Sequence, residues 1–161
     1  MKPHEIFGHM SQERALHVLQ QVKAKLPGVY TQAVGAACVT LKARPQFMMK
    51  QSKEKQAQFV RSALARFAAS PIAEEVLAAY FLEVRRDLLT EWLDALGIEH
   101  ENGILKQDNP AEPSREKLSE AVAKFRAGDG GDDRELLLQA FAAQSAVEWP
   151  ALDALLEASP A

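Results

Sequence analysis

The chain has 161 residues, of which 47% are hydrophobic and 25% charged, and its formal net charge is −3 at pH 7. This length is typical of one domain, and the composition is that of a globular protein rather than a disordered or membrane-spanning one. No run approaches the roughly 18 consecutive apolar residues of a transmembrane helix, and no apolar segment follows the first residues as in a secretory signal. Cys38 is the single cysteine, which excludes an internal disulfide. We therefore expect a cytoplasmic protein without a membrane partner, and the richness in alanine favours a bacterial source.

Composition and periodicity both predict an all-α fold. The chain has 27 Ala and 19 Leu against 17 residues of Val, Ile and Thr together, so helix formers outnumber the residues that pack well in strands. Apolar residues recur at helical spacing in three stripes, which begin at Val34, Phe59 and Leu118. No run alternates for long enough to predict a strand.

Caps and helix breakers divide the chain into six to seven helices. Ser11, Ser52 and Ser114 are expected N-caps, Asp132 or Asp133 is another, and Pro27-Gly28 and Gly97 are expected ends. The expected helices span approximately residues 12–25, 31–43, 53–69, 71–96, 115–127 and 133–145, followed by a short helix after Trp149-Pro150.

The helix over about 71–96 is expected to be the long central element of the bundle. Its first half carries an apolar face that includes Val76 and Tyr80, and the face of its second half, which includes Trp92, lies about a third of a turn away. The segment 97–114 holds two Gly and two Pro and is a possible subdomain break. We expect a single helical domain over residues 1–161.

Charge is distributed unevenly along the chain. Residues 1–70 carry 11 basic and 3 acidic residues, whereas residues 71–161 carry 8 basic and 19 acidic residues. Seven cations fall between residues 42 and 66, and these are the candidate contacts for nucleic acid: Lys42, Arg44, Lys50, Lys53, Lys55, Arg61 and Arg66. The alternative is that this basic segment faces the acidic half of the chain or of a neighbouring subunit. Within it, Met48 and Met49 beside Phe47 form either an adaptable contact surface for a partner or part of the core.

Residues suited to catalysis are few. Glu5, His9, Glu13 and His17 are spaced by fours, as in metal sites of helical bundles, but the row drifts around the helix, and we expect a solvated face without a metal. Arg85 is a candidate for a structural ion pair or a pocket. His100, between Glu99 and Glu101, is a second candidate for the same role, and the simpler reading is a polar turn that caps the preceding helix.

These observations favour a non-catalytic helical interaction or assembly module, which acts through a protein partner or self-association and needs no cofactor. One alternative is a nucleic-acid-associated protein that uses segment 42–66. Another is a small metal-assisted enzyme that uses the Glu5–His17 row or the region of Arg85 and His100. The sequence contains no motif that fixes the shape of a ligand.

Overall fold

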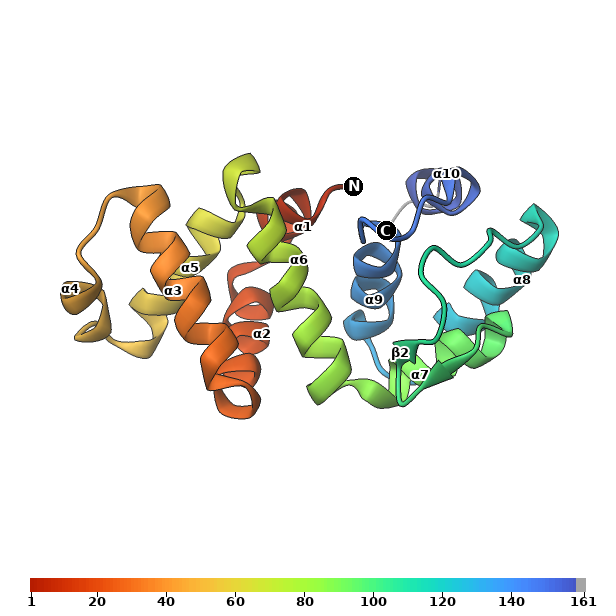
Figure 1. The fold of residues 1–161 in the computed structure, drawn as a ribbon, viewed down its shortest axis with the longest axis horizontal. Helices are drawn as coiled ribbons and strands as arrows, with labels where there is room; N and C mark the ends of the chain where they lie inside the picture. Colours follow the sequence, from red (N-terminus) through yellow and green to blue (C-terminus); the bar gives the residue numbers. More distant parts are fainter. Residues whose placement is uncertain (159–161) are drawn as a thin grey trace. The chain divides into compact units, whose positions relative to one another are not determined.

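The protein is all-α in the computed structural model, which describes residues 1–158 (Figure 1). Its only strands within these residues are the two-residue arms of a hairpin, and the helical chain includes one 3₁₀ turn and one π segment. In order, the elements are α1 (Pro3–His9), α2 (Gln12–Lys25), α3 (Pro27–Leu41), α4 (Pro45–Met49), α5 (Lys53–Leu64), the 3₁₀ turn η1 (Phe67–Ala69), α6 (Ser70–Ala79), the π segment η2 (Tyr80–Val84), α7 (Arg86–Leu96), β1 (His100–Glu101), β2 (Ile104–Leu105), α8 (Arg115–Arg126), α9 (Asp132–Ala142) and α10 (Pro150–Ala158).

Local sequence signals explain most helix boundaries. The hydroxyls of Ser11, Ser52 and Ser114 each accept a hydrogen bond from a backbone N–H in the first turn of the helix they precede, so these three predicted caps are confirmed. The predicted helix end before Pro27-Gly28 is confirmed, because α2 ends at Lys25. Helix α3 begins at Pro27 rather than near residue 31, since proline is tolerated in the first turn, where its missing N–H costs nothing. Two further helices, α1 and α4, are not predicted from the sequence, and both are short and begin with proline.

The chain divides into two compact units, with the boundary between Val84 and Arg85. We call residues Lys2–Val84 the N-terminal unit and the residues from Arg85 onward the C-terminal unit. The segment 97–114, expected as a possible subdomain break, lies inside the C-terminal unit, and the single-domain organisation stays a prediction. The N-terminal unit carries 11 basic and 6 acidic residues and the C-terminal unit 8 basic and 16 acidic residues, so their formal charges are +5 and −8.

The predicted helix over 71–96 is divided at the same boundary. After α6 the backbone widens into the π segment η2, and at Arg85 it leaves the helical region, with φ −121° and ψ 45°. A π segment adds one residue to a turn, which rotates the following side chains by about 100°. The shift of about a third of a turn between the two apolar faces is therefore explained by this interruption. Residues 71–96 do not form the single long central helix that the sequence predicts.

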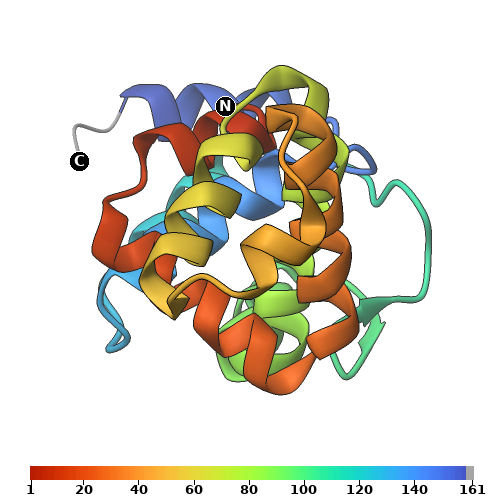
Figure 2. The same ribbon diagram turned by 90° about the vertical axis from the view of Figure 1, so that its left-hand side faces the viewer.

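In the N-terminal unit, α2, α3 and α5 pack against one another, and α6 packs against α1 and α3. Figure 2 shows α3, α4 and α5 on the face turned to the viewer, with the short α4 between the other two. The core is formed by alanines and branched aliphatic residues together with Phe7 and Tyr80. Closely spaced alanines allow these helices to approach one another closely.

In the C-terminal unit, α7, α8 and α9 enclose a chain of edge-to-face aromatic contacts. Trp92 contacts Phe125 and Phe141, whose ring centroids lie 5.4 and 5.9 Å away, and Trp149 lies 5.2 Å from Phe141. Such pairs add about 0.5–1.5 kcal/mol each beyond the area that they bury. Helix α10 completes this unit by packing against α8 and α9.

The buried Arg134 connects several segments of the C-terminal unit. The guanidinium of Arg134 pairs with Glu91, donates to the carbonyls of Phe125 and Asp129 at 2.9 and 2.7 Å, and lies over the Phe125 ring. A Cβ at Gly128 would lie only 2.4–2.7 Å from that guanidinium. The glycine-rich segment before α9 therefore closes around Arg134.

None of the helices in residues 1–158 combines the length and the apolar character needed to cross a lipid bilayer.

Candidate interaction surface

Five of the seven candidate cations lie at the solvent-exposed junctions around α4. Lys42 ends α3, Arg44 precedes α4, Lys50 ends α4, and Lys53 and Lys55 lie in the first turn of α5. Within the part of the chain that the structure describes, none of these five is paired with a carboxylate. Their charges therefore remain available to a ligand or partner.

The other two cations are placed differently. Arg61 is half-buried, and its guanidinium donates to the carbonyl of Met10, which closes the turn between α1 and α2. This contact is structural and removes Arg61 from the exposed group. Arg66 is exposed but precedes η1, at the opposite end of α5 from Lys53.

Large apolar side chains are exposed among the five cations. Phe47 and Met49 on α4 are 62% and 58% exposed, and Val39, in the last turn of α3, is 81% exposed. Met48 between them is buried. The two interpretations of this segment thus apply to different residues: Met48 is core, and Phe47 and Met49 are surface.

A buried polar network holds α4 in this position. The Tyr30 hydroxyl donates to Gln56 Oε1 at 2.6 Å, and Gln56 Nε2 donates to the carbonyl of Met48 at 3.1 Å. Gln56 Nε2 also lies 3.9 Å from the sulfur of Met49. A buried polar side chain that satisfies partners on two other elements fixes one arrangement of those elements. The network therefore fixes α4 in the position that leaves Phe47 and Met49 largely exposed.

The entry to α4 is also fixed by backbone geometry. Lys42 adopts the left-handed conformation, with φ 55°, and the N–H of Ala43 donates to the carbonyl of Cys38 at 2.9 Å. This hydrogen-bond pattern ends many helices, usually with glycine at the left-handed position. Pro45 then supplies a first-turn residue with a suitable φ.

A cleft of about 430 Å³ opens between α2 and α5 in the same unit. It is lined by Gln20, Lys23, Ala24, Tyr30, Lys53 and Ala57. The Nζ atom of Lys23 lies 5.3 Å from the centroid of the Tyr30 ring, a cation–π contact. Lys53 belongs both to this cleft and to the exposed cations around α4. Sequence reasoning missed the cleft because Lys23 lies outside segment 42–66, and only the packing of α2 against α5 brings it near Lys53.

Burial raises the pKa of Tyr30 to about 12 from its ordinary value of 10.0. Because the folded state favours the neutral phenol, its contribution to stability is complete below pH about 10 and is lost as the pH rises toward about 12. We expect Tyr30→Phe to remove this part of the alkaline sensitivity. Circular dichroism across an alkaline titration measures unfolding, and the ultraviolet absorbance of tyrosinate assigns the ionisation. An unchanged alkaline midpoint in the variant would contradict the expectation.

Arg85 and His100, the two other candidate residues, both lie in the C-terminal unit. Arg85 Nη1 lies 3.1 Å from Asp133 Oδ2, and Arg85 also pairs with Asp87 at 3.2 Å. Partial burial raises the pKa of the Asp87 carboxyl, but hydrogen bonds from Arg85 and the backbone lower it by more, so the pKa falls below its ordinary value. This arrangement links the start of α7 to α9 through an ion pair.

His100 lies in the hairpin that follows α7. Its Nε2 lies 2.7 Å from Asp94 Oδ1, and its Nδ1 accepts a hydrogen bond from the N–H of Gly103 at 3.1 Å. A neutral ring with the proton on Nε2 satisfies both contacts. The imidazole thus links the last turn of α7 to the hairpin turn.

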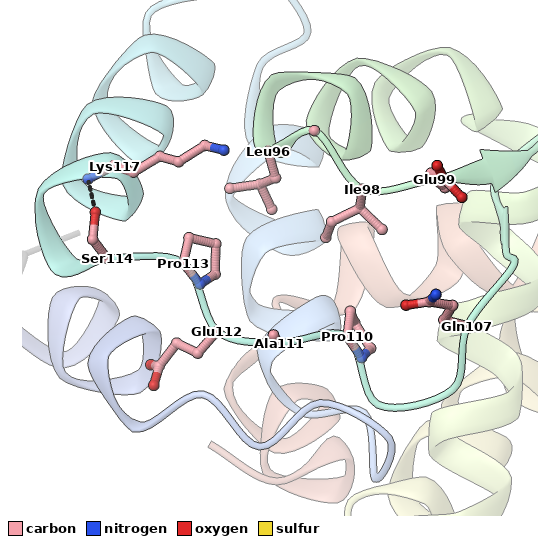
Figure 3. Close-up of a pocket in the computed structure, with 11 residues that line it drawn as sticks. Leu96, Ile98, Glu99, Gln107, Pro110, Ala111, Glu112, Pro113, Ser114 and Lys117 are labelled. Carbon is pink, nitrogen blue, oxygen red and sulfur yellow. Dashed lines mark hydrogen bonds between the residues drawn. The ribbon is translucent and has the colours of Figure 1, made fainter.

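The C-terminal unit also contains a cleft of about 590 Å³, between the end of α7, the segment 107–114 and the start of α8 (Figure 3). The side chain of Lys117 extends across it toward the Leu96 end of α7. Its outer wall is held in place by Trp149, whose Nε1 donates to the Pro110 carbonyl at 2.9 Å. Glu112, in the same wall, accepts from the N–H of Ala151 at 2.8 Å. The Glu112 carboxylate is therefore bound to the N-terminal turn of α10.

The Glu5–His17 row does not form one face. Glu5 and His9 lie on α1, Glu13 and His17 lie on α2, and the chain leaves the helical conformation between them at Met10. No group of three or more potential metal ligands lies together within the described residues. Cys38 is buried, and burial raises the pKa of its thiol, which disfavours the reactive thiolate.

Comparisons with protein-family models, curated proteins and solved structures find no match to this chain.

Proposed function

We propose that the chain is a non-catalytic, cytoplasmic interaction module whose N-terminal unit binds a protein partner through the α4 surface. The α4 surface comprises the apolar side chains Val39, Phe47 and Met49 and the cations Lys42, Arg44, Lys50, Lys53 and Lys55. The observation that carries the proposal is the exposure of Phe47 and Met49 on a helix that is itself fixed from below by Gln56.

The residue types on the α4 surface support this proposal. Isolated exposed apolar residues are common, but an aromatic ring and a methionine on one short exposed helix are typical of contact surfaces. Methionine side chains adapt their shape to a partner, and aromatic side chains contribute much of the binding energy at the centres of interfaces. The surrounding cations suit the polar rim of such an interface and would steer an acidic partner toward it.

The test is photo-crosslinking from the α4 surface in cells that express the full chain. Phe47 is replaced by benzoylphenylalanine, and the same replacement at Phe67, which is 80% exposed and lies in the same unit, is the matched control. We expect protease-sensitive, nuclease-resistant adducts from position 47 and few from position 67. Adducts of twice the chain mass would identify self-association. Equal yields from both positions would contradict the proposal.

A second candidate function is binding of single-stranded nucleic acid through segment 42–66. The observation that favours it is the combination of five exposed cations with the exposed Phe47 ring, because such proteins combine a cationic track with aromatic stacking. It predicts nuclease-sensitive adducts from position 47 and RNA binding that weakens steeply with salt. Reversal of Lys53 and Lys55 to glutamate would then abolish RNA retention at low salt.

A further inference from the structure

The α4 surface and the α2–α5 cleft are physically connected. Lys53 contributes to both, because it begins α5 directly after the exposed segment and also lines the cleft. Tyr30, which lines the cleft, bonds to Gln56, and Gln56 in turn holds the carbonyl of Met48 on α4. A ligand that covers α4 and reaches into the cleft would therefore contact one continuous, rigidly supported region.

The chemistry of the cleft points to a carboxylate. Its lining combines Tyr30 and the small side chains of Ala24 and Ala57 with two charged residues, Lys23 and Lys53. Within the described chain, neither lysine has a carboxylate partner, although Lys23 lies against the Tyr30 ring. Two ammonium groups in a lining that also holds alanine and tyrosine favour an aliphatic acid side chain, whose methylene groups contact the apolar residues while its charge meets both lysines.

The α4 surface favours a helical partner over one that adds a strand. Extended peptides that bind by strand addition need a free sheet edge, and the described N-terminal unit contains no strand. An amphipathic helix instead presents an apolar stripe with charged residues on either side. An acidic helix of this kind is complementary to an apolar patch surrounded by cations.

Resting on the proposed function, we propose that the partner contributes an acidic amphipathic helix. Its apolar stripe covers Phe47 and Met49, and one of its flanking Glu or Asp side chains enters the α2–α5 cleft between Lys23 and Lys53. This assigns a binding role to Lys23, which is remote in sequence from the basic segment.

The experiment measures fluorescence anisotropy of labelled peptides with the full chain. Three peptides of the same length are stapled to keep them helical: one with a leucine stripe flanked by glutamates, one with the same composition but scrambled positions, and one with the same stripe flanked by lysines. The chain variants are Lys23→Glu and Phe47→Ser. Their matched controls are Lys25→Glu, which changes an exposed lysine of α2 outside the cleft, and Phe67→Ser, which removes another exposed ring.

We expect the acidic striped peptide to bind at least about tenfold more tightly than the other two peptides. Lys23→Glu and Phe47→Ser should each weaken its binding about tenfold, whereas Lys25→Glu and Phe67→Ser should change it less than about twofold. Equal binding of the striped and scrambled acidic peptides would overturn the inference, because it would show a response to charge alone. Equal losses from Lys23→Glu and Lys25→Glu would overturn the assignment of the cleft.

The failure of this inference can be distinguished from the failure of the proposed function. If position 47 crosslinks to protein in cells and the acidic striped peptide does not bind, a protein partner exists but is not an acidic amphipathic helix. If position 47 gives nuclease-sensitive adducts and the chain binds single-stranded RNA in place of the peptide, both proposals are wrong and the nucleic-acid function is supported.

Discussion

Replacement of Arg134 by methionine should lower the free energy of unfolding of the C-terminal unit by about 3–4 kcal/mol. The Arg134 side chain is only 8% exposed and binds Glu91 together with the carbonyls of Phe125 and Asp129. Methionine preserves much of the aliphatic volume but leaves the Asp129 carbonyl without its donor and the Phe125 carbonyl with only the N–H of Gly128. It also removes the guanidinium around which the segment near Gly128 closes. The loss is therefore greater than that expected for a solvent-exposed ion pair.

Urea unfolding followed by tryptophan fluorescence measures this effect selectively. Both tryptophans of the chain, Trp92 and Trp149, lie in the C-terminal unit, so their emission reports the unit that contains Arg134. The control is Arg126→Met, because Arg126 pairs with Glu135 at 2.7 Å in a more exposed position, and its loss should cost about 1 kcal/mol or less. Similar losses of unfolding free energy in the two variants would contradict the expectation that burial makes the contacts of Arg134 more stabilising than those of Arg126.

Replacement of Gln56 by leucine should destabilise the N-terminal unit by about 2 kcal/mol and loosen α4. Leucine fills the space but leaves the buried Tyr30 hydroxyl without its acceptor, and the Met48 carbonyl keeps only the N–H of Gln51. Because α4 has only five residues, it has little helical stability of its own once this anchor is removed. Phe47 and Met49 would then lose their fixed outward orientation.

Two measurements test this expectation. Thermal unfolding followed by circular dichroism gives the loss of stability, and limited trypsin digestion follows the opening of α4 through cleavage after the exposed Lys42 and Lys50. The control is Gln58→Leu, an exposed position on the same helix, which should be nearly neutral. In the Gln56→Leu background, Tyr30→Phe should recover part of the loss, because it removes the unsatisfied hydroxyl. A Gln56→Leu chain as stable and as protease-resistant as the parent would contradict the role given to this network.

The sequence predicted the parts of the fold that depend on local interactions. Serine caps form hydrogen bonds with backbone groups three residues away, and alanine and leucine favour helix whatever surrounds them, so Ser11, Ser52 and Ser114 could be assigned without tertiary information. Periodicity also reveals a phase shift within residues 71–96. The shift alone is compatible with one helix that changes its neighbours along its length, and its cause in the structure is the π segment and the turn at Arg85.

The candidate site was predictable in part. Composition located a cationic segment at 42–66, but charge alone does not tell which cations are free. The Arg61 side chain donates to the carbonyl of Met10, a partner 51 residues away in the chain, and is therefore not part of the exposed group. Lys23 and Lys53 are likewise brought to one cleft only by the packing of α2 against α5.

The all-α class, most helix boundaries and the uneven distribution of charge follow from residue type or from spacing within a few residues, so they can be predicted without a structure. The burial of Met48 beside the exposed Phe47 and Met49 emerges only from packing, since it depends on Gln56 and Tyr30 of other helices. Packing also makes Arg134 an interior residue, because its partners come from α7, α8 and the segment before α9. Burial and hydrogen bonding between distant residues are properties of the packed chain, and neither can be read from local pattern.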